Sequence, residues 1–311
     1  MVKHIKHLAR LARRKILNKV KWFIGIMYLI LGTPGFRSHI IAFVFHEIGN
    51  SPREHARLTN TYCTNETFSK QIDLLTKNFK FIDPRNNTNW VDLTGCLLTF
   101  DDGYLGALEA AKTLEVLKIP SIHFVNLETI YGQFNSSALS HFKSLNSEGD
   151  FNWFNSTPLI MERTLSHLSS SDRDDLQEFS GPYMNPFQLS ELNSLEYTTL
   201  GDHFLNHWYA ESLTDTETLE NLSRNAEGFT EKNLIQPFFA APHGSISNRK
   251  IELISKQGYD VFFSGTSWMK IANSCVIPRI DMNNSISSKA GLFGAIAILV
   301  LRNKRQSKKR K

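Results

Sequence analysis

The sequence predicts an α/β protein whose parallel strands close into a barrel of the (β/α)7 type. Short apolar runs alternate with amphipathic helical segments along most of the 311 residues, which is the pattern of parallel strands joined by right-handed crossovers. The runs are apolar almost throughout, as in strands that are buried on both faces. Because every run is short, a closed or nearly closed barrel fits better than an open sheet.

The expected elements follow in order from apolar periodicity and from helix start and stop residues. The expected strands span residues 40–46, 96–100, 121–125, 196–203, 237–244, 259–265 and 275–282. The expected helices span residues 66–79, 105–117, 186–195, 211–229 and 248–258. A polar segment at about 128–185 interrupts the alternation, and we expect short helices and a loop there, either as a substrate-contact insertion or as a surface elaboration.

Three parts of the chain are expected from this pattern. Residues 1–38 form a basic and apolar N-terminal segment, residues 39–286 form a single α/β domain, and residues 287–311 form an apolar helix with a basic tail. The charge is distributed in the same way. Residues 1–22 carry eight Lys/Arg and residues 302–311 carry seven, with no acid in either segment, and the rest of the chain holds 20 basic and 30 acidic residues.

The basic ends point to an anionic membrane surface rather than to nucleic acid, because each adjoins an apolar stretch. These stretches, Trp22–Gly32 and Gly291–Leu301, have eleven residues each, fewer than the roughly 20 that span a bilayer. We therefore expect a membrane-associated protein with an interfacial anchor; a signal-anchor and ordinary helix faces docked on the body are the alternatives. The sequence indicates no protein partner.

Ionisable residues stand where the expected strands end, which is where barrel enzymes place their active sites. They are His46, Asp101, Asp102, Asp202, His203, His243, Arg279 and Asp281. Turn formation alone would favour Gly, Asn and Ser at these positions rather than three histidines. The segment LLTFDDGY is typical of this pattern, since it leads a buried strand directly into two adjacent carboxylates.

His203 and His207 are four residues apart in GDHFLNHW. If this segment is helical, both imidazoles lie on one face and can present two nitrogens to a divalent ion. Together with Asp102 they form a two-nitrogen, one-oxygen set that leaves a position open for water, as catalytic metal sites require.

Three motifs in order resemble the polysaccharide deacetylases of the NodB-homology type, carbohydrate esterase family 4. TFDDG is similar to the first motif of that family, HFLNH to its His-x-x-x-His motif, and FAAPHGS to its third motif. The resemblance runs from about Ile40 to Met282 and implies a distorted β/α barrel. It also implies a glycan substrate and a hydrolase that removes N-acetyl groups from N-acetylhexosamine residues of a polysaccharide or a lipid-linked glycan.

The resemblance implies a role for each matching residue. Asp102, His203 and His207 would hold the divalent metal, and Asp101 would be the general base that takes a proton from water. Zn²⁺ is the expected ion, and Co²⁺, Ni²⁺ or Fe²⁺ would suit similar ligands.

The general acid must come from elsewhere, because many members of the family use a late histidine and this chain has no His after His243. A branch that acts on poly-N-acetylglucosamine places an equivalent histidine on the first strand. VFHEIG offers His46 in that position, so we expect His46 to be the general acid; a core histidine is the alternative.

The third motif departs from the family pattern Arg-x-Pro-Tyr, since Ala240 stands in place of the arginine. The backbone N–H of His243 remains a candidate oxyanion donor. We expect Arg279 to replace the missing arginine and Asp281 to orient His46. Trp208 follows the second motif where Pro is usual, and we expect an exposed indole that stacks on a sugar, with a packed aromatic as the alternative.

Two other functions are compatible with the sequence. The missing arginine motivates a non-catalytic glycan-binding relative, although glycan binding alone does not need a general base such as Asp101. An esterase or another amidase on the same scaffold would use the same residues.

Overall fold

The computed structural model describes residues 2–30, 40–86, 90, 93–146, 157–228, 235–265, 269–271 and 274–309. Seven parallel strands form the centre of the fold, and the first pairs with the last, so the sheet closes into a barrel. The barrel strands are β1 (Ile40–Phe45), β4 (Gly95–Phe100), β5 (Ser121–Val125), β6 (Thr198–Asp202), β7 (Ile235–Ala240), β8 (Val261–Ser264) and β10 (Ser274–Asp281). This architecture confirms the predicted (β/α)7-type barrel.

The barrel has one irregularity and one addition. The register between β6 and β7 shifts between Leu200 and Asp202, immediately before His203. A short strand, β9 (Met269–Ile271), pairs antiparallel with β10 on the outside of the closed set. The strands β2 (Glu47–Ile48) and β3 (Tyr62–Cys63) form a separate two-stranded sheet.

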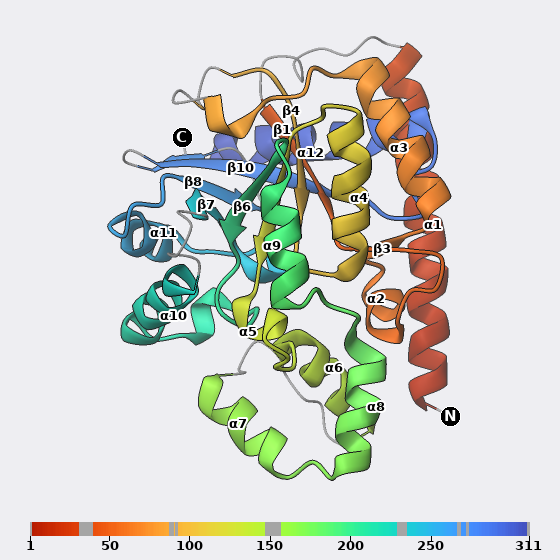
Figure 1. The fold of residues 1–311 in the computed structure, drawn as a ribbon. Helices are drawn as coiled ribbons and strands as arrows, with labels where there is room; N and C mark the ends of the chain where they lie inside the picture. The colour runs from red at the N-terminus through yellow and green to blue at the C-terminus, as the bar shows by residue number, and fades with distance from the viewer. Residues whose placement is uncertain are drawn as a thin grey trace.

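Helices surround the barrel, as Figure 1 shows. Within the domain they are α2 (Glu54–Thr59), α3 (Asn65–Asn78), α4 (Leu105–Val116), α5 (Leu127–Ile130), α6 (Ser136–Asn146), α7 (Pro158–Ser166), α8 (Ser170–Ser180), α9 (Pro186–Ser194), α10 (Asp215–Glu227) and α11 (Asn248–Ser255). Several begin at caps that the sequence signals; at α10, the Thr214 side chain accepts from the Glu217 N–H and the Glu217 carboxylate accepts from the Thr214 N–H. The 3₁₀ turns are η1 (Pro84–Asn86), η3 (Ala210–Ser212) and η5 (Pro242–Gly244).

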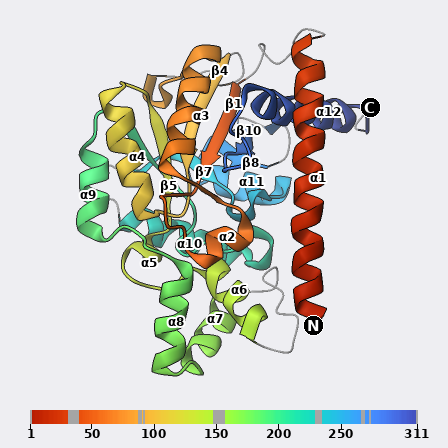
Figure 2. The same cartoon turned by 90° about the vertical axis from the view of Figure 1, so that its right-hand side faces the viewer.

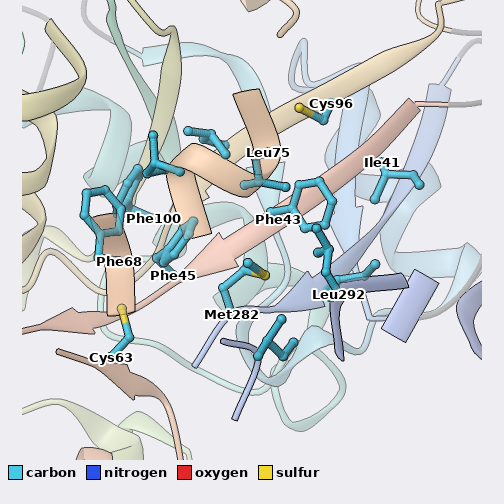
Figure 3. Packing of buried hydrophobic residues seen from close by; sticks show 14 of the residues in the cluster. Ile41, Phe43, Phe45, Cys63, Phe68, Leu75, Cys96, Phe100, Met282 and Leu292 are labelled. Carbon is cyan, nitrogen blue, oxygen red and sulfur yellow. The ribbon is translucent and has the colours of Figure 1, made fainter. Parts of the chain in front are cut away.

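The strands bury side chains on both faces, which explains their continuous apolar runs. Ile40 and Ala42 of β1 belong to the cluster that includes Phe124 and Phe263 of other barrel strands. The alternate residues of β1 pack in another cluster with α3 and with the last helix; Figure 3 shows Ile41, Phe43 and Phe45 among them. Burying a side chain of this size contributes about 1.5–3 kcal/mol to folding.

The helices α1 (Val2–Ile30) and α12 (Lys289–Lys309) contact one another across a close crossing at the side of the barrel. Figure 2 shows α1 upright beside the domain with α12 crossing it. Glycines make the crossing possible: a Cβ on Gly25 would lie 1.8 Å from the Ala290 carbonyl oxygen, and one on Gly294 would lie 1.9 Å from the Lys21 carbonyl oxygen. Among the described residues, no helix combines the length and apolar character needed to cross a bilayer.

The segment expected to be an insertion contains α5, α6, α7 and α8, of which the last three gather at one end of the barrel (Figure 1). Ser137 and His141 of α6 line the cleft at the strand ends. This placement puts part of the insertion beside the candidate site.

Candidate active site

A cleft of about 520 Å³ opens at the carboxyl ends of the barrel strands. Six of the residues predicted from the strand ends line it, namely His46, Asp101, Asp102, His243, Arg279 and Asp281, and His207 joins them. His203 is buried with 1% of its surface exposed and lies against the two aspartates. The structure therefore brings the predicted polar residues together around one cavity.

The turn after β4 sets the direction of the two carboxylates. The Asp101 N–H donates to the Phe45 carbonyl at 3.0 Å, which ties this turn to β1. Asp102 and Gly103 both have positive φ, 71° and 76°, a conformation that costs little only at glycine. A Cβ at Gly103 would also lie 2.8 Å from Ile130 Cδ1. The glycine of TFDDG is thus needed for the turn that presents Asp102.

Asp102, His203 and His207 form a group whose ligand atoms all lie within 4.8 Å of one another. The Asp102 Oδ1 atom is 3.5 Å from His203 Nε2 and 3.3 Å from His207 Nε2. In the described part of the chain, Asp102 Oδ1 and His203 Nε2 are buried without a hydrogen-bond partner. Because buried polar atoms are normally satisfied, these two atoms and the donor set fit a divalent cation.

A backbone acceptor fixes the orientation of His203. Its Nδ1 lies 2.8 Å from the Ala240 carbonyl oxygen, so Nδ1 must be the protonated nitrogen and Nε2 carries the lone pair. This arrangement is the usual one for a histidine that binds a metal through one nitrogen and donates from the other. Ala240 of the third sequence motif therefore orients His203 of the second motif through its backbone carbonyl.

The second motif is not helical, so its two histidines do not come together through helical spacing. Residues 203–207 form a turn, and Phe204 and His207 have positive φ of 58° and 51°. The Asp202 carboxylate stabilises this turn by accepting the Phe204 N–H at 2.7 Å, and it also accepts the Tyr259 hydroxyl at 2.7 Å. The turn still directs both histidines at Asp102.

Asn126 and Tyr259 support the second motif, and the sequence reasoning missed both. The Asn126 side chain donates to the carbonyls of His203 and Phe204. Burial raises the pKa of Asp202 to about 6, while the hydrogen bond from Tyr259 opposes that shift. One feature of the sequence could have pointed to Tyr259. Asp202 is an acid at the end of a buried strand, and a buried carboxylate requires a hydrogen-bond donor nearby.

Asp101 lies among cationic partners and is 1% exposed. The Arg279 Nη1 atom donates to its Oδ1 at 2.7 Å, and His203 Nε2 and His46 Nε2 lie 3.7 and 3.9 Å from its Oδ2. Burial alone would raise the pKa of Asp101, but Arg279, followed by His203 and His46, holds it below its usual value. The carboxylate is therefore ionised and able to accept a proton.

The third motif places His243 in the turn after β7. His243 adopts φ 59° within η5, and its ring centroid lies 4.5 Å from that of His207. Burial, followed by the neighbouring His207, lowers the pKa of His243 well below its usual value. Its side chain is thus a neutral wall of the cleft next to the candidate metal ligands.

Two predicted residues are placed differently from expectation. The expectation of an exposed indole at Trp208 is wrong, because Trp208 is 4% exposed and packs in the apolar cluster with Phe204 and Phe239. Asp281 lines the cleft, but no hydrogen bond or ion pair joins it to His46 among the described residues. Trp208 is therefore a packed aromatic, which was the alternative. The orienting role of Asp281 stays a prediction.

A second histidine pair, His55 and His141, lies on the cleft wall and was not predicted. The two rings approach with His55 Nε2 and His141 Nδ1 3.2 Å apart, and His55 Nδ1 lies 3.4 Å from the Tyr104 hydroxyl. Burial, then the neighbouring His141, lowers the pKa of His55 to about 3. No motif spacing connects these residues, since α2 and the insertion supply one each.

Comparison with solved structures identifies the fold. IcaB from Ammonifex degensii matches 83% of this chain and 97% of its own at 18% identity and a TM-score of 0.54. A de-N-acetylase from Aggregatibacter actinomycetemcomitans matches 82% of this chain and 99% of its own at 10% identity and a TM-score of 0.56. The chain has the fold of the NodB-like polysaccharide deacetylases.

A third similar structure is that of BC0361, a polysaccharide deacetylase from Bacillus cereus. It matches 83% of this chain and 68% of its own, at 11% identity and a TM-score of 0.52. No known family profile matches the sequence, and no curated protein matches it either. The fold implied by the three sequence motifs is therefore confirmed by the structural comparison.

Proposed function

We propose that this protein is a metal-dependent deacetylase that removes N-acetyl groups from N-acetylhexosamine residues of a polysaccharide or a lipid-linked glycan. The observation that carries the proposal is the pairing of two adjacent carboxylates with different surroundings. Asp102 shares a group with His203 and His207, while Asp101 is held ionised by Arg279. Proteins of the same fold that are described as deacetylases support it.

Asp102, His203 and His207 would hold the divalent ion, with Zn²⁺ as the expected metal. When bound, such an ion polarises the amide carbonyl and lowers the pKa of water. The residues of the chain supply the remaining functions. The rest of the cleft wall would hold the sugar.

Two side chains carry out the proton transfers of the proposed reaction, one as the base and one as the acid. Water attacks the acetamide carbonyl carbon, and Asp101 takes one proton from that water. The C–N bond then breaks, and His46, acting as an imidazolium, gives its proton to the departing amine. The products are acetic acid, which ionises to acetate in solvent, and a free amino sugar. Before the next turnover, a proton must pass from Asp101 to solvent and one from solvent to His46.

Two further groups assist in this proposal. The His243 backbone N–H, after Pro242, would donate to the oxyanion. Arg279 positions Asp101, which supplies from β10 the contact that the third motif lacks. This contact weighs against a non-catalytic relative, because a glycan-binding protein has no need for a base held in its ionised form.

Acetate release from an N-acetylglucosamine oligomer by the full chain tests the proposal, with the protein first stripped by a chelator and then given Zn²⁺ or Co²⁺. We expect metal-dependent release that Asp101→Asn abolishes while one metal equivalent stays bound. Metal-independent release, or full release by Asp101→Asn, would contradict it. Release from an acetyl ester but from no amide would favour the esterase alternative.

We propose in addition that α1 lies on an anionic membrane surface. Ile16, Val20, Phe23, Met27 and Ile30, spaced three or four residues apart, form one stripe that is between 39% and 71% exposed. Gly25, the contact to α12, lies half a turn out of phase with Ile16. The exposed stripe therefore faces away from the protein, with the exposed Arg13 and Lys19 on either side of it.

Co-sedimentation with vesicles tests this placement. Wild type should bind vesicles that contain phosphatidylglycerol more tightly than pure phosphatidylcholine vesicles, and Phe23→Ser/Ile30→Ser should release it. Phe187→Ser is the matched control, because Phe187 of α9 is 79% exposed outside α1. Equal binding of wild type and the α1 variant would rule the placement out.

A further inference from the structure

A second pocket of about 260 Å³ adjoins the cleft on the side of α1 and α12. The two cavities share six lining residues, Thr59, Thr61, Gly265, Arg279, Asp281 and Arg302. They are therefore neighbouring compartments of one depression. A ligand that occupies the cleft can extend into the second pocket without leaving the protein surface.

Two cations from different helices line the second pocket. Lys21 comes from α1, in the turn whose carbonyl lies at the Gly294 crossing, and Arg302 comes from α12. Within the described part of the chain, neither makes an ion pair. The third cation of the pocket, Arg279, is already paired with Asp101. Asp281 is the one acid on this wall, so the unpaired groups carry a net positive charge.

The same wall of the second pocket also contains apolar residues, whose aliphatic side chains complete its lining. They are Ile280, Ile286, Ala295, Ile298 and Leu299. Four of these five residues are 9% exposed or less, so they offer a narrow apolar strip. Two cations beside such a strip suit a phosphate that is esterified to an alkyl chain, because Lys and Arg bind phosphate oxygens while the first methylenes of the chain lie on the strip. A neutral polysaccharide would use neither feature.

We infer that the second pocket binds the phosphate and the first lipid segment of a lipid-linked N-acetylated sugar. This inference deepens the proposed function, on which it rests, and selects the lipid-linked substrate over the free polysaccharide. Because the two cavities share Arg302, Arg279 and Asp281, a phosphate in the second pocket lies next to the cleft that would hold the amide. Asp281, at the boundary, suits a sugar hydroxyl. The proposed contact of α1 with a membrane surface would bring this pocket close to substrates that are anchored there by a lipid.

Two soluble substrates separate the phosphate from the lipid. Both carry the same N-acetylglucosamine and the same octyl chain; one is the octyl phosphodiester at C1 and the other is the octyl glycoside. We expect the full-length enzyme to favour the phosphodiester at least tenfold in kcat/KM. Lys21→Gln/Arg302→Gln should lower that preference at least tenfold, and Lys256→Gln, at the exposed C-cap of α11, should keep it. An equal preference in wild type and the double variant would overturn the inference.

Direct binding keeps this test independent of catalysis. Octyl phosphate, which has no acetyl group, should bind the metal-loaded protein at one site by titration calorimetry, at least tenfold tighter than inorganic phosphate, and the double variant should lose that site. Binding of octyl phosphate with no acetate release from any substrate would refute the proposed function and leave the subsite standing. Binding of octyl phosphate no tighter than inorganic phosphate would refute the lipid part.

The phosphate could also belong to a membrane phospholipid, and vesicles distinguish that source. The double variant should still sediment with phosphatidylglycerol vesicles as wild type does, because the outer stripe of α1 is intact. Loss of vesicle binding together with unchanged octyl phosphate binding would assign Lys21 and Arg302 to the membrane headgroups and overturn the inference.

Discussion

Arg279 donates from Nη1 to the Oδ1 atom of Asp101 at 2.7 Å, and both side chains are almost completely buried. The two residues are 178 positions apart in sequence. They meet because Asp101 follows β4 and Arg279 lies on β10, and both strands pair with β1, which lies between them. A charge pair of this kind is costly to break, because it leaves one charge buried without compensation.

Replacing Arg279 by Gln should lower kcat about 100-fold while KM changes little. The reason is that Asp101 loses the partner that keeps it ionised and oriented, whereas no sugar contact is removed. Steady-state kinetics on the N-acetylglucosamine substrate, with metal content measured in parallel, check this. Arg249→Gln, which removes an exposed ion pair with Asp215, is the control and should retain wild-type kcat. A rise in KM alone would mean that Arg279 binds substrate.

His46→Ala should lower amide turnover about 100-fold or more and leave the bound metal in place. An aryl acetate such as 4-nitrophenyl acetate offers a sharper comparison, because phenolate departs without a proton. The loss in His46→Ala should be much smaller on this ester, whereas Asp101→Asn should lose activity on both substrates. Equal losses on amide and ester would show that His46 does not protonate the leaving group.

His207→Ala should weaken metal binding by at least about 100-fold, since it removes one of three ligands. The measurement is competition with a chromophoric chelator. His141→Ala, a histidine on the same cleft wall outside the group, should bind metal as wild type does. If both variants kept the metal, the ligand set would have to be assigned elsewhere.

Protonation of buried histidines should make the metal-free protein less stable as the pH falls. His123 is buried and stacked on Phe100 with ring centroids 4.5 Å apart, and burial lowers its pKa to about 3. The unfolded chain takes up this proton below about pH 6.5, whereas the folded chain does so only near pH 3. The stabilising effect is therefore complete above pH 6.5 and is lost progressively between pH 6.5 and 3.

Urea unfolding in a chelator at pH 7.5 and pH 5 measures this effect. The His123→Phe variant keeps the stacked ring and should reduce the pH-dependent loss of unfolding free energy by about 2 kcal/mol. The exposed His167, replaced in the same way, remains in water in both states and should leave the loss unchanged. An identical pH dependence in wild type and His123→Phe would contradict the assignment.

Gly294→Ala should separate α1 from α12, because the added methyl would lie 1.9 Å from the Lys21 carbonyl oxygen. Overpacking of this kind costs about 1–3 kcal/mol. The same substitution at Gly291 meets its nearest atom at 3.4 Å and serves as the control in the same helix. Limited trypsin digestion should cleave within α1 faster in Gly294→Ala and at the wild-type rate in Gly291→Ala.

Much of the barrel could be predicted because its strands are buried on both faces and its catalytic candidates follow those strands directly. The continuous apolar runs IIAFVF and GCLLTF are typical of buried strands, and His46 and Asp101 follow them directly. The Arg279 contact was also predictable in kind, since a missing arginine leaves a buried carboxylate that needs a partner.

Other features depend on contacts that no local pattern encodes. The turn at residues 203–207 has positive φ at Phe204 and His207. Asp202 at the end of β6, which accepts the Tyr259 hydroxyl, and the distant Asn126 hold it by hydrogen bonds. Trp208 is buried by a cluster that includes residues of the insertion, such as Leu139 and Met161. Residue spacing predicts neither, because both result from tertiary packing.

The crossing of α1 and α12 has a consequence for the order of synthesis. Almost the whole chain separates the two helices, so α1 leaves the ribosome long before the glycine-bearing surface of α12 exists. During translation α1 has no helix to receive Gly25, and β1 has no β10 beside it. Barrel closure and helix crossing must therefore come last and must join the two ends of the chain, which places the slow, long-range step of folding at the end.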